Sequence, residues 1–139
     1  MAGNRTFSMI KPDAVRDGHV GSILKMIEGG GFRIVEMKLT YLSAERAGQF
    51  YSVHTGKPFF DGLVSIMSES AIVALVLEKE NAVGDFRKFI GSTNPANAEE
   101  GTVRKVFAKS MERNAVHGSD SDENAELEAS FFFSKMEQY

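Results

Sequence analysis

A run of seven apolar residues at positions 71–77 constrains the fold of this chain more than any other stretch. The run is too short for a helix of its own, and it contains the β-branched residues Ile72, Val73 and Val76, which favour strands. It is also far shorter than the roughly 20 apolar residues that cross a bilayer as a helix. The run therefore predicts a buried strand in the centre of a sheet, which the rest of the chain must complete and cover.

Strand and helix patterns alternate along the remaining sequence without a linker or an internal repeat. Apolar patterns typical of strands predict further strands at residues 5–10, 32–42 and 114–117. Apolar residues at helical spacing predict helices at residues 20–28, 44–53, 59–67, 81–90 and 122–131. Pro12 halts the first strand, and Ser43 offers an N-cap to the second helix. The alternation predicts one α+β domain over residues 1–139, a sandwich whose helices pack on one face of the sheet.

Local patterns add detail to this prediction. The glycines at 29–31 end a helix, and no Gly-Lys-Ser/Thr follows them to make a phosphate-binding loop. Residues 91–101 form an irregular loop, and a loop of this length in a compact domain is usually functional or flexible. Asp120 and Glu123 have the spacing of a capping box. The phenylalanines at 131–133 fit no single element, and residues 32–42 place Met37 on the face opposite Phe32.

The composition limits the classes of protein to which the chain can belong. It has no cysteine, which excludes disulfides and cysteine-ligated metals and suits a reducing cytoplasm. Its start lacks the apolar run of a secretory signal, and a formal net charge of −3 argues against a basic surface for nucleic acid. The composition therefore predicts a soluble, cytoplasmic protein that neither spans a membrane nor binds a specific nucleic acid.

Residues 114–121, Asn-Ala-Val-His-Gly-Ser-Asp-Ser, contain the strongest chemical candidate. The neutral imidazole of His117 is a nucleophile at physiological pH, and Gly118 lets the backbone bend and leaves room for a substrate. Ser119 and Asp120 offer short side chains that can cap the next helix. The alternative is that His117 is an ordinary turn residue before a helix.

Glu128 lies about two helical turns beyond the start of the last predicted helix. If this helix runs back along the last strand, the Glu128 carboxylate could approach His117 and orient it. A carboxylate behind a histidine fixes the tautomer of the ring and favours positive charge on it during a reaction. The alternative is a glutamate on the surface of the helix.

Several scattered side chains are hydrogen-bond donors suited to a polyphosphate and a sugar. They are Lys11, Tyr51, Arg87, Thr93, Arg104 and Asn114. Taken singly, each is a solvated residue, and a lysine at a strand end usually extends to solvent. Phe59 and Phe60 are neighbours in a predicted helix, so one of them is expected to be exposed or in a cleft. The alternative is a helix packed between two apolar surfaces.

Six motifs occur in the order seen in the nucleoside diphosphate kinase family. They are Ile10-Lys-Pro-Asp-Ala-Val15, Tyr51 with His54, Lys57-Pro-Phe-Phe-Asp-Gly-Leu-Val64, Gly91-Ser-Thr-Asn-Pro-Ala96, Gly101-Thr-Val-Arg104 and Asn114-Ala-Val-His-Gly-Ser-Asp120. No single motif is decisive, but six in order make coincidence implausible. From about residue 4 to its end, the chain resembles this family.

The resemblance implies a ferredoxin-like α/β sandwich, with helices packed on a four-stranded antiparallel sheet in the order βαββαβ. It implies an enzyme that transfers the γ-phosphate of a nucleoside triphosphate to a nucleoside diphosphate, by a ping-pong mechanism through a phosphohistidine. His117 matches the phosphorylated histidine, Glu128 and Ser119 match the pair that holds it, and Lys11 matches a further residue of the catalytic site.

The resemblance also assigns a nucleotide-binding site. Lys11 and Asn114 match residues that bind the ribose hydroxyls, and Tyr51, His54, Arg87, Thr93 and Arg104 match the phosphate contacts. Phe59 matches the aromatic residue on which the base stacks, Met111 matches an apolar residue on the other face of the base, and Leu63 belongs to the same site. None of these residues is expected to bind a metal directly, because Mg²⁺ is expected to bridge phosphate oxygens. Stacking without an edge-reading donor implies broad base specificity.

The implied partners are ATP, other nucleoside tri- and diphosphates, and further copies of the chain. The family forms tetramers or hexamers built from dimers, and the sequence leaves the choice open. The alternative function is a non-catalytic, ferredoxin-like nucleotide- or RNA-binding module, which should carry aromatic residues on adjacent strands and a basic face. The predicted strands are aliphatic and the net charge is negative, so the enzyme is the favoured interpretation. Replacing His117 separates the two, because a binding module would be indifferent to the change.

Overall fold

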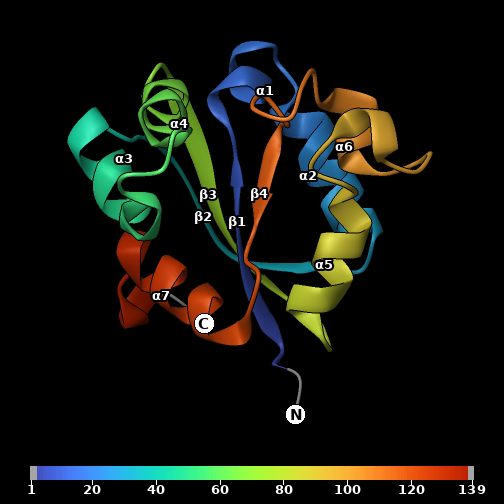
Figure 1. Cartoon of the computed structure of the whole chain (residues 1–139). Helices are drawn as coiled ribbons and strands as arrows, with labels where there is room; N and C mark the ends of the chain where they lie inside the picture. The colour runs from blue at the N-terminus through green and yellow to red at the C-terminus, as the bar shows by residue number, and fades with distance from the viewer. Residues whose placement is uncertain (1–2, 138–139) are drawn as a thin grey trace.

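The computed structural model describes residues 3–137, over which the chain forms one sheet with helices around it (Figure 1). The strands are β1 (Arg5–Ile10), β2 (Arg33–Tyr41), β3 (Ala71–Glu78) and β4 (Val116–Gly118). The α-helices are α1 (Pro12–Arg16), α2 (Val20–Gly29), α3 (Ala44–Phe50), α4 (Phe60–Met67), α5 (Ala82–Ile90), α6 (Val103–Phe107) and α7 (Asp122–Phe132). Short 3₁₀ helices are η1 (Ser52–His54), η2 (Pro95–Asn97) and η3 (Lys135–Glu137).

The strand order is β2-β3-β1-β4, and every neighbouring pair is antiparallel. The apolar run at 71–77 lies in β3, between β1 and β2, as the sequence predicts for a central strand. Together with the connections, this order confirms the predicted ferredoxin-like sandwich. The short strand β4 lies at one edge of the sheet, paired with the end of β1, where Met9 faces His117 in the register.

Helices cover both faces of the sheet, so the prediction of helices on one face alone is wrong (Figure 1). Side chains of β3 alternate between two apolar cores: Val73 and Leu75 belong to one, Ile72 and Ala74 to the other. The first core is closed by α2, α5 and α6, and the second by α3, α4 and α7. A strand that is apolar on both sides requires cover on both sides, because each exposed face would leave apolar area in water.

Several element boundaries differ from the prediction. The short helices α1 and α6 have too few residues to show an apolar period, and the sequence did not indicate them. The helix capped by Ser43 ends at Phe50 and a 3₁₀ turn follows, while Ser43 accepts from Arg46 N as expected. Ser121, not Asp120, caps the last helix by accepting from Asn124 N. That helix extends to Phe132, and Phe133 is buried in the second core.

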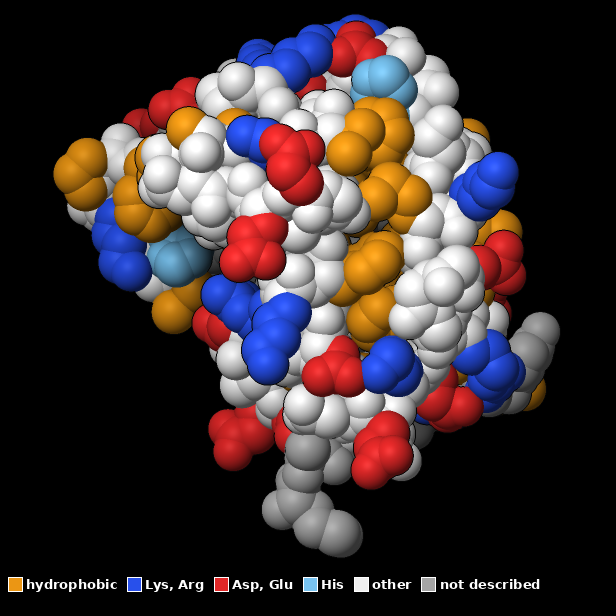
Figure 2. Space-filling model, turned by 90° about the vertical axis from the view of Figure 1, so that its right-hand side faces the viewer, with side chains coloured by type: hydrophobic (Ala, Val, Ile, Leu, Met, Phe, Trp, Pro, Cys, Tyr) orange, Lys and Arg blue, Asp and Glu red, His pale blue; other side chains and the backbone are white. Residues whose placement is uncertain are grey.

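The side of the molecule that carries α2, α5 and α6 shows a strip of apolar side chains bordered by charged residues (Figure 2). On the edge strand β2, Met37 and Leu39 are 49% and 69% exposed, although Val35 on the same strand is buried. A register shift between Ile34 and Glu36 interrupts the pairing of β2 there. Within residues 3–137, no helix is both long enough and apolar enough to cross a membrane.

Candidate active site

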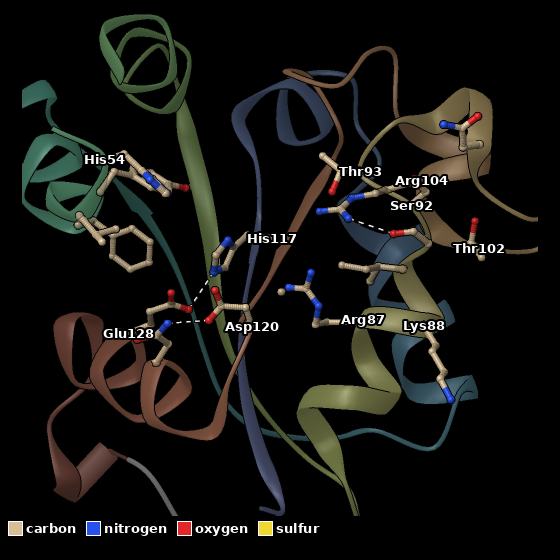
Figure 3. A pocket seen from close by; sticks show the side chains of 18 of the residues that line it. His54, Arg87, Lys88, Ser92, Thr93, Thr102, Arg104, His117, Asp120 and Glu128 are labelled. Carbon is tan, nitrogen blue, oxygen red and sulfur yellow. Dashed lines mark hydrogen bonds and ion pairs between the residues drawn. The ribbon is translucent and has the colours of Figure 1, made fainter. Parts of the chain in front are cut away.

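A cleft of about 1040 Å³ opens beside β4, between α5 with the loop that follows it and the side formed by α3 and α7 (Figure 3). Seven of the residues singled out from the sequence line it. These are Tyr51, His54, Arg87, Thr93, Arg104, His117 and Glu128. They come from five separate parts of the chain, and the fold brings them to one place.

His117 lies in the middle of β4, with its ring packed against Phe7 and Phe50 at centroid distances of 6.0 and 5.9 Å. Its Nε2 lies 2.8 Å from Oε1 of Glu128 on α7. The same carboxylate oxygen accepts from Oγ of the buried Ser119 at 2.6 Å. The predicted approach of Glu128 to His117 is therefore confirmed, and the strand and helix run as that prediction required (Figure 3).

This contact determines which nitrogen of the ring can react. An ionised carboxylate only accepts, so we infer that Nε2 carries the proton and donates a hydrogen bond to Glu128. Nδ1 of the neutral ring then has a free lone pair. Nδ1 makes no hydrogen bond to any of the described residues. Because the ring lines the cleft, Nδ1 is available to a ligand there. The arrangement supplies a neutral nitrogen nucleophile with a carboxylate behind it.

A strained turn precedes the histidine. Ala115 has φ of 71°, and Val116 N donates to Asn114 O across it at 2.8 Å. This is a γ-turn of positive φ, the rarer and more strained of the two γ-turn forms. Because the turn occupies Asn114 and Ala115, β4 begins at Val116, two residues later than predicted, and it ends at Gly118, one residue later than predicted.

Gly118 does not serve the bend that the sequence suggested. It lies within β4, and a Cβ added there would lie 3.1 Å from Cδ1 of Ile90 and 3.2 Å from Phe86 on α5. The glycine therefore lets α5 pack closely against the strand that carries His117. Close packing of this kind keeps the histidine at a fixed distance from the cations of α5.

Arg104 is buried at the base of the cleft and holds two parts of the chain together. Its Nη1 donates to Gly91 O at 3.0 Å and its Nη2 donates to Val116 O at 2.8 Å. Nε is buried without a partner among the described residues. Burial, with the nearby charge of Arg87, lowers the pKa of Arg104 to about 10. The guanidinium therefore remains charged at neutral pH and ties the loop after α5 to β4.

Lys11, which follows β1 directly, is also buried, contrary to the alternative of a solvent-exposed lysine. Burial lowers the pKa of its ammonium group to about 8, and the charge of Arg104 acts in the same direction. The carboxylate of Asp13 acts in the opposite direction and supports the charge. Two cations thus meet in a poorly solvated region, which favours an anionic ligand.

The opposite wall of the cleft is aromatic and polar. The Tyr51 hydroxyl is buried and has no hydrogen-bond partner within residues 3–137. Burial raises the pKa of this phenol, with a smaller contribution from Glu128, so the group stays a neutral donor. Phe59 lies next to this wall without lining the cleft: its ring is 5.1 Å from that of His54, and the residue is 52% exposed. Phe60 is partly buried and packs against the second core. The expectation that one of the two phenylalanines is exposed is confirmed.

Some residues predicted for the site do not line the cleft. These are Lys11, Phe59, Leu63, Met111, Asn114 and Ser119. Asn114 is buried, its Nδ2 donates to Met111 O at 3.0 Å, and its Oδ1 has no partner in the described part of the chain. Met111 is 57% exposed, and Leu63 packs against the second core.

Other residues line the cleft that the sequence did not single out as site residues. They are Phe50, Val53, Lys88, Ile90, Gly91, Ser92, Asn97, Glu99, Thr102, Gly118, Asp120 and Asn124. Asp120 accepts from Asn124 Nδ2 at 2.6 Å, a contact between residues four apart across the start of α7. The spacing of Asp120 and Asn124, and the position of Thr102 as the N-cap of α6, are signals in the sequence that could have indicated these three residues.

The comparisons with known proteins agree with this geometry. The sequence model of the family described as nucleoside diphosphate kinase matches residues 4–138. A nucleoside diphosphate kinase of Flavobacterium psychrophilum is 58% identical over 139 residues, which cover all of both chains.

Two solved structures have the same fold. The nucleoside diphosphate kinase of Aquifex aeolicus has a TM-score of 0.95 at 40% identity, covering 98% of this chain and 99% of that one. The enzyme of Halobacterium salinarum in complex with CDP has a TM-score of 0.92 at 35% identity, covering 99% and 92%.

The fold and these relatives define the class of the protein as an enzyme that transfers phosphate between nucleotides. Within that class, the chain belongs to the nucleoside diphosphate kinase family.

Proposed function

We propose that the chain transfers the γ-phosphate of a nucleoside triphosphate to a nucleoside diphosphate in two half-reactions through His117. The observation that carries the proposal is the 2.8 Å contact between His117 Nε2 and Glu128, which leaves Nδ1 free beside the cleft. One domain, residues 1–139, performs both half-reactions.

In the first half-reaction, the lone pair of Nδ1 attacks the γ-phosphorus of the donor. The bond from this phosphorus to the β–γ bridging oxygen breaks, and the nucleoside diphosphate leaves with that electron pair. The ring keeps its proton on Nε2, and Glu128 stabilises the positive charge that develops. In the second half-reaction, a β-phosphate oxygen of the acceptor attacks phosphorus, and the phosphorus–nitrogen bond breaks to restore neutral His117.

Charge neutralisation by the protein suits a reaction in which little else is required beyond alignment. Arg87 and Arg104 line the cleft across from His117 (Figure 3). Lys11 lies close enough to Arg104 to feel its charge. We assign them to the phosphates, together with Thr93, His54 and Tyr51. The unpartnered hydroxyl of Tyr51 supports its assignment, because a buried donor gains most from a ligand that accepts its proton.

We assign the nucleoside to the side of the cleft near Phe59. Its half-exposed ring next to His54 offers a flat apolar face on which any base can stack. Met111 is assigned to the other face of the base and Leu63 to the surrounding apolar wall. The partnerless Oδ1 of Asn114 and the ammonium of Lys11 are assigned to the ribose hydroxyls. No member of this set is placed to read a base edge, so discrimination among bases is expected to be weak.

Mg²⁺ fits the site as a companion of the nucleotide. Among the described residues, no group of three or more histidine and carboxylate side chains could hold a metal by itself. Magnesium keeps several waters and commonly takes its other ligands from substrate phosphates. When bound, it supplies charge neutralisation at the phosphate oxygens.

We also propose a homo-oligomer, a tetramer or hexamer built from dimers, that works in the cytoplasm. The exposed Met37 and Leu39 on the edge strand β2 support an assembly, since an apolar edge strand is usually covered. The apolar strip over α2, α5 and α6 supports it too (Figure 2). Light scattering at micromolar concentration is expected to give the mass of an assembly, and the mass of a monomer would contradict this.

Labelling with Mg²⁺-ATP tests the central proposal. Without an acceptor, one phosphate per subunit is expected on His117, lost in acid and stable in alkali, with release of ADP. His117→Ala should abolish labelling and transfer but retain nucleotide binding. His19→Ala is the matched control, because His19 lies outside the cleft at the start of α2 and should keep full labelling. Acid-stable label, or label retained in His117→Ala, would exclude the mechanism.

A further inference from the structure

Residues Lys11 to Asp13 bind both backbone polar groups of Ala115. Lys11 N donates to Ala115 O at 2.8 Å, and Ala115 N donates to Asp13 Oδ2 at 3.2 Å. Ala115 is the residue of positive φ in the γ-turn before His117. A strained backbone conformation persists only when its surroundings over-determine it. The two contacts from the segment after β1 provide that constraint, and one of them comes from a side chain.

Asp13 is unusual for a carboxylate in this chain because it is 1% exposed. Its Oδ2 accepts from Ala115 N, and its Oδ1 has no hydrogen-bond partner among the described residues. A buried carboxylate with one unsatisfied oxygen is costly and needs a compensating charge. Two nearby positive charges interact with the Asp13 carboxylate, the ammonium of Lys11 and the guanidinium of Arg113.

We propose that Asp13 is a positioning residue of the transfer reaction: it holds the γ-turn at Ala115 and thereby places Asn114 and His117. The proposal rests on the proposed function of His117. The turn lies directly between the side chain assigned to the ribose and the nucleophile, so a change in φ at Ala115 moves one relative to the other. The same carboxylate raises the pKa of Lys11, against the opposite effects of burial and of the charge of Arg104.

Asp13→Ala is the sharpest variant, because it removes the oxygen that accepts from Ala115 N, whereas the amide oxygen of an asparagine could still accept there. Single-turnover labelling of His117 is expected to slow by about 100-fold, the effect of a misplacement of roughly 1 Å at a reacting group. The alkaline limb of the pH profile of kcat/KM should move to lower pH, because Lys11 loses the carboxylate that supports its proton. Asp17→Ala, at the C-terminal end of the same helix and outside the cleft, is the control and should match wild type.

A second substitution separates positioning from a general structural role. Glycine adopts positive φ as readily as negative φ, so Ala115→Gly needs the contact with Asp13 less. In the Ala115→Gly background, the factor by which Asp13→Ala slows labelling should be several-fold smaller than in the wild-type background. An unchanged penalty, or a loss of stability with a normal labelling rate for the folded fraction, overturns the proposal.

The geometry can also be tested without activity, which separates this proposal from the proposed function. The ¹⁵N shifts of the His117 ring and of the Asn114 amide, in nucleotide-free protein, should differ between wild type and Asp13→Ala and be unchanged in Asp17→Ala. If wild type fails to label His117, the proposed function fails, and these shifts still decide whether Asp13 holds the turn. Unchanged shifts in Asp13→Ala would refute the positioning role.

Discussion

The carboxylate of Glu128 is expected to accelerate the phosphorylation of His117 through its charge rather than its shape. Glu128→Gln tests this, because an amide oxygen can still accept from both His117 Nε2 and Ser119 Oγ, the two donors that now converge on Oε1. The substitution removes only the negative charge. The ring should keep its tautomer and position, and the positive charge of the reacting ring should lose its partner.

The size of the effect follows from the burial of the pair. Two unit charges about 4 Å apart interact by about 4 kcal/mol at an effective dielectric constant of about 20. The side chains of His117 and Glu128 are 18% and 21% exposed, so solvent screens part of this energy. We expect a loss of about 2–3 kcal/mol in the transition state, which corresponds to a rate about 30- to 150-fold lower.

Rapid-quench labelling with Mg²⁺-ATP measures the rate of the first half-reaction directly. Glu126→Gln on the same helix is the control, because Glu126 is exposed and does not line the cleft. A Glu128→Gln rate within a factor of about two of wild type would refute the electrostatic reasoning. Loss of cooperative unfolding in the variant would instead make Glu128 a structural residue.

Three further predictions concern the cations and the base. The pKa of Lys11 is lowered to about 8 from an ordinary value of 10.5, so kcat/KM for nucleotides should fall above about pH 8. The cost of burying the charge should reduce the free energy of unfolding below pH 8 and should disappear between about pH 8 and 10.5. Lys11→Met should remove both effects from the pH profiles of activity and stability. Arg87→Ala should change the free energy of unfolding by less than about 0.5 kcal/mol, whereas Arg104→Ala should lower it by about 1–3 kcal/mol because two carbonyl oxygens lose their donor. Both variants should slow transfer. Equal urea midpoints for the two variants would contradict the predicted difference in stability. Phe59→Ala should raise KM for GDP and for CDP by similar factors, each equivalent to about 1–3 kcal/mol of lost stacking energy. A ten-thousandfold preference for one of these two acceptors in steady-state kinetics would show instead that the site reads a base edge.

The order of the elements could be predicted from the sequence because apolar periods of two and 3.6 residues are local properties. The strand at 5–10 and the central strand at 71–77 were recognised in this way. The approach of Glu128 to His117 could be predicted too, because it needed only a helix that follows a strand and runs back along it. The motifs that resemble the family then predicted the remaining site residues.

What only the tertiary structure decided depends on contacts between distant segments. Whether a strand is covered on one face or on two depends on where the connecting helices pack. The sequence of β3 does not indicate which helix covers which face of the sheet. Lys11 and Arg104 are buried near one another because both bind the segment at 115–116: Lys11 N donates to Ala115 O, and Arg104 Nη2 donates to Val116 O.

The sequence by itself predicted His117 as the nucleophile, Glu128 as its carboxylate, and the apolar strands, since each prediction depends on residue types and short spacings. Only the tertiary structure shows that Ala115 lies in a γ-turn whose backbone N–H donates to Asp13. It also shows that Gly118 allows α5 to pack closely against β4, and that Arg104 donates to two backbone carbonyls. The physical reason is that backbone strain, close packing and desolvation have no local signature in a sequence; they exist only once the surrounding elements are in place.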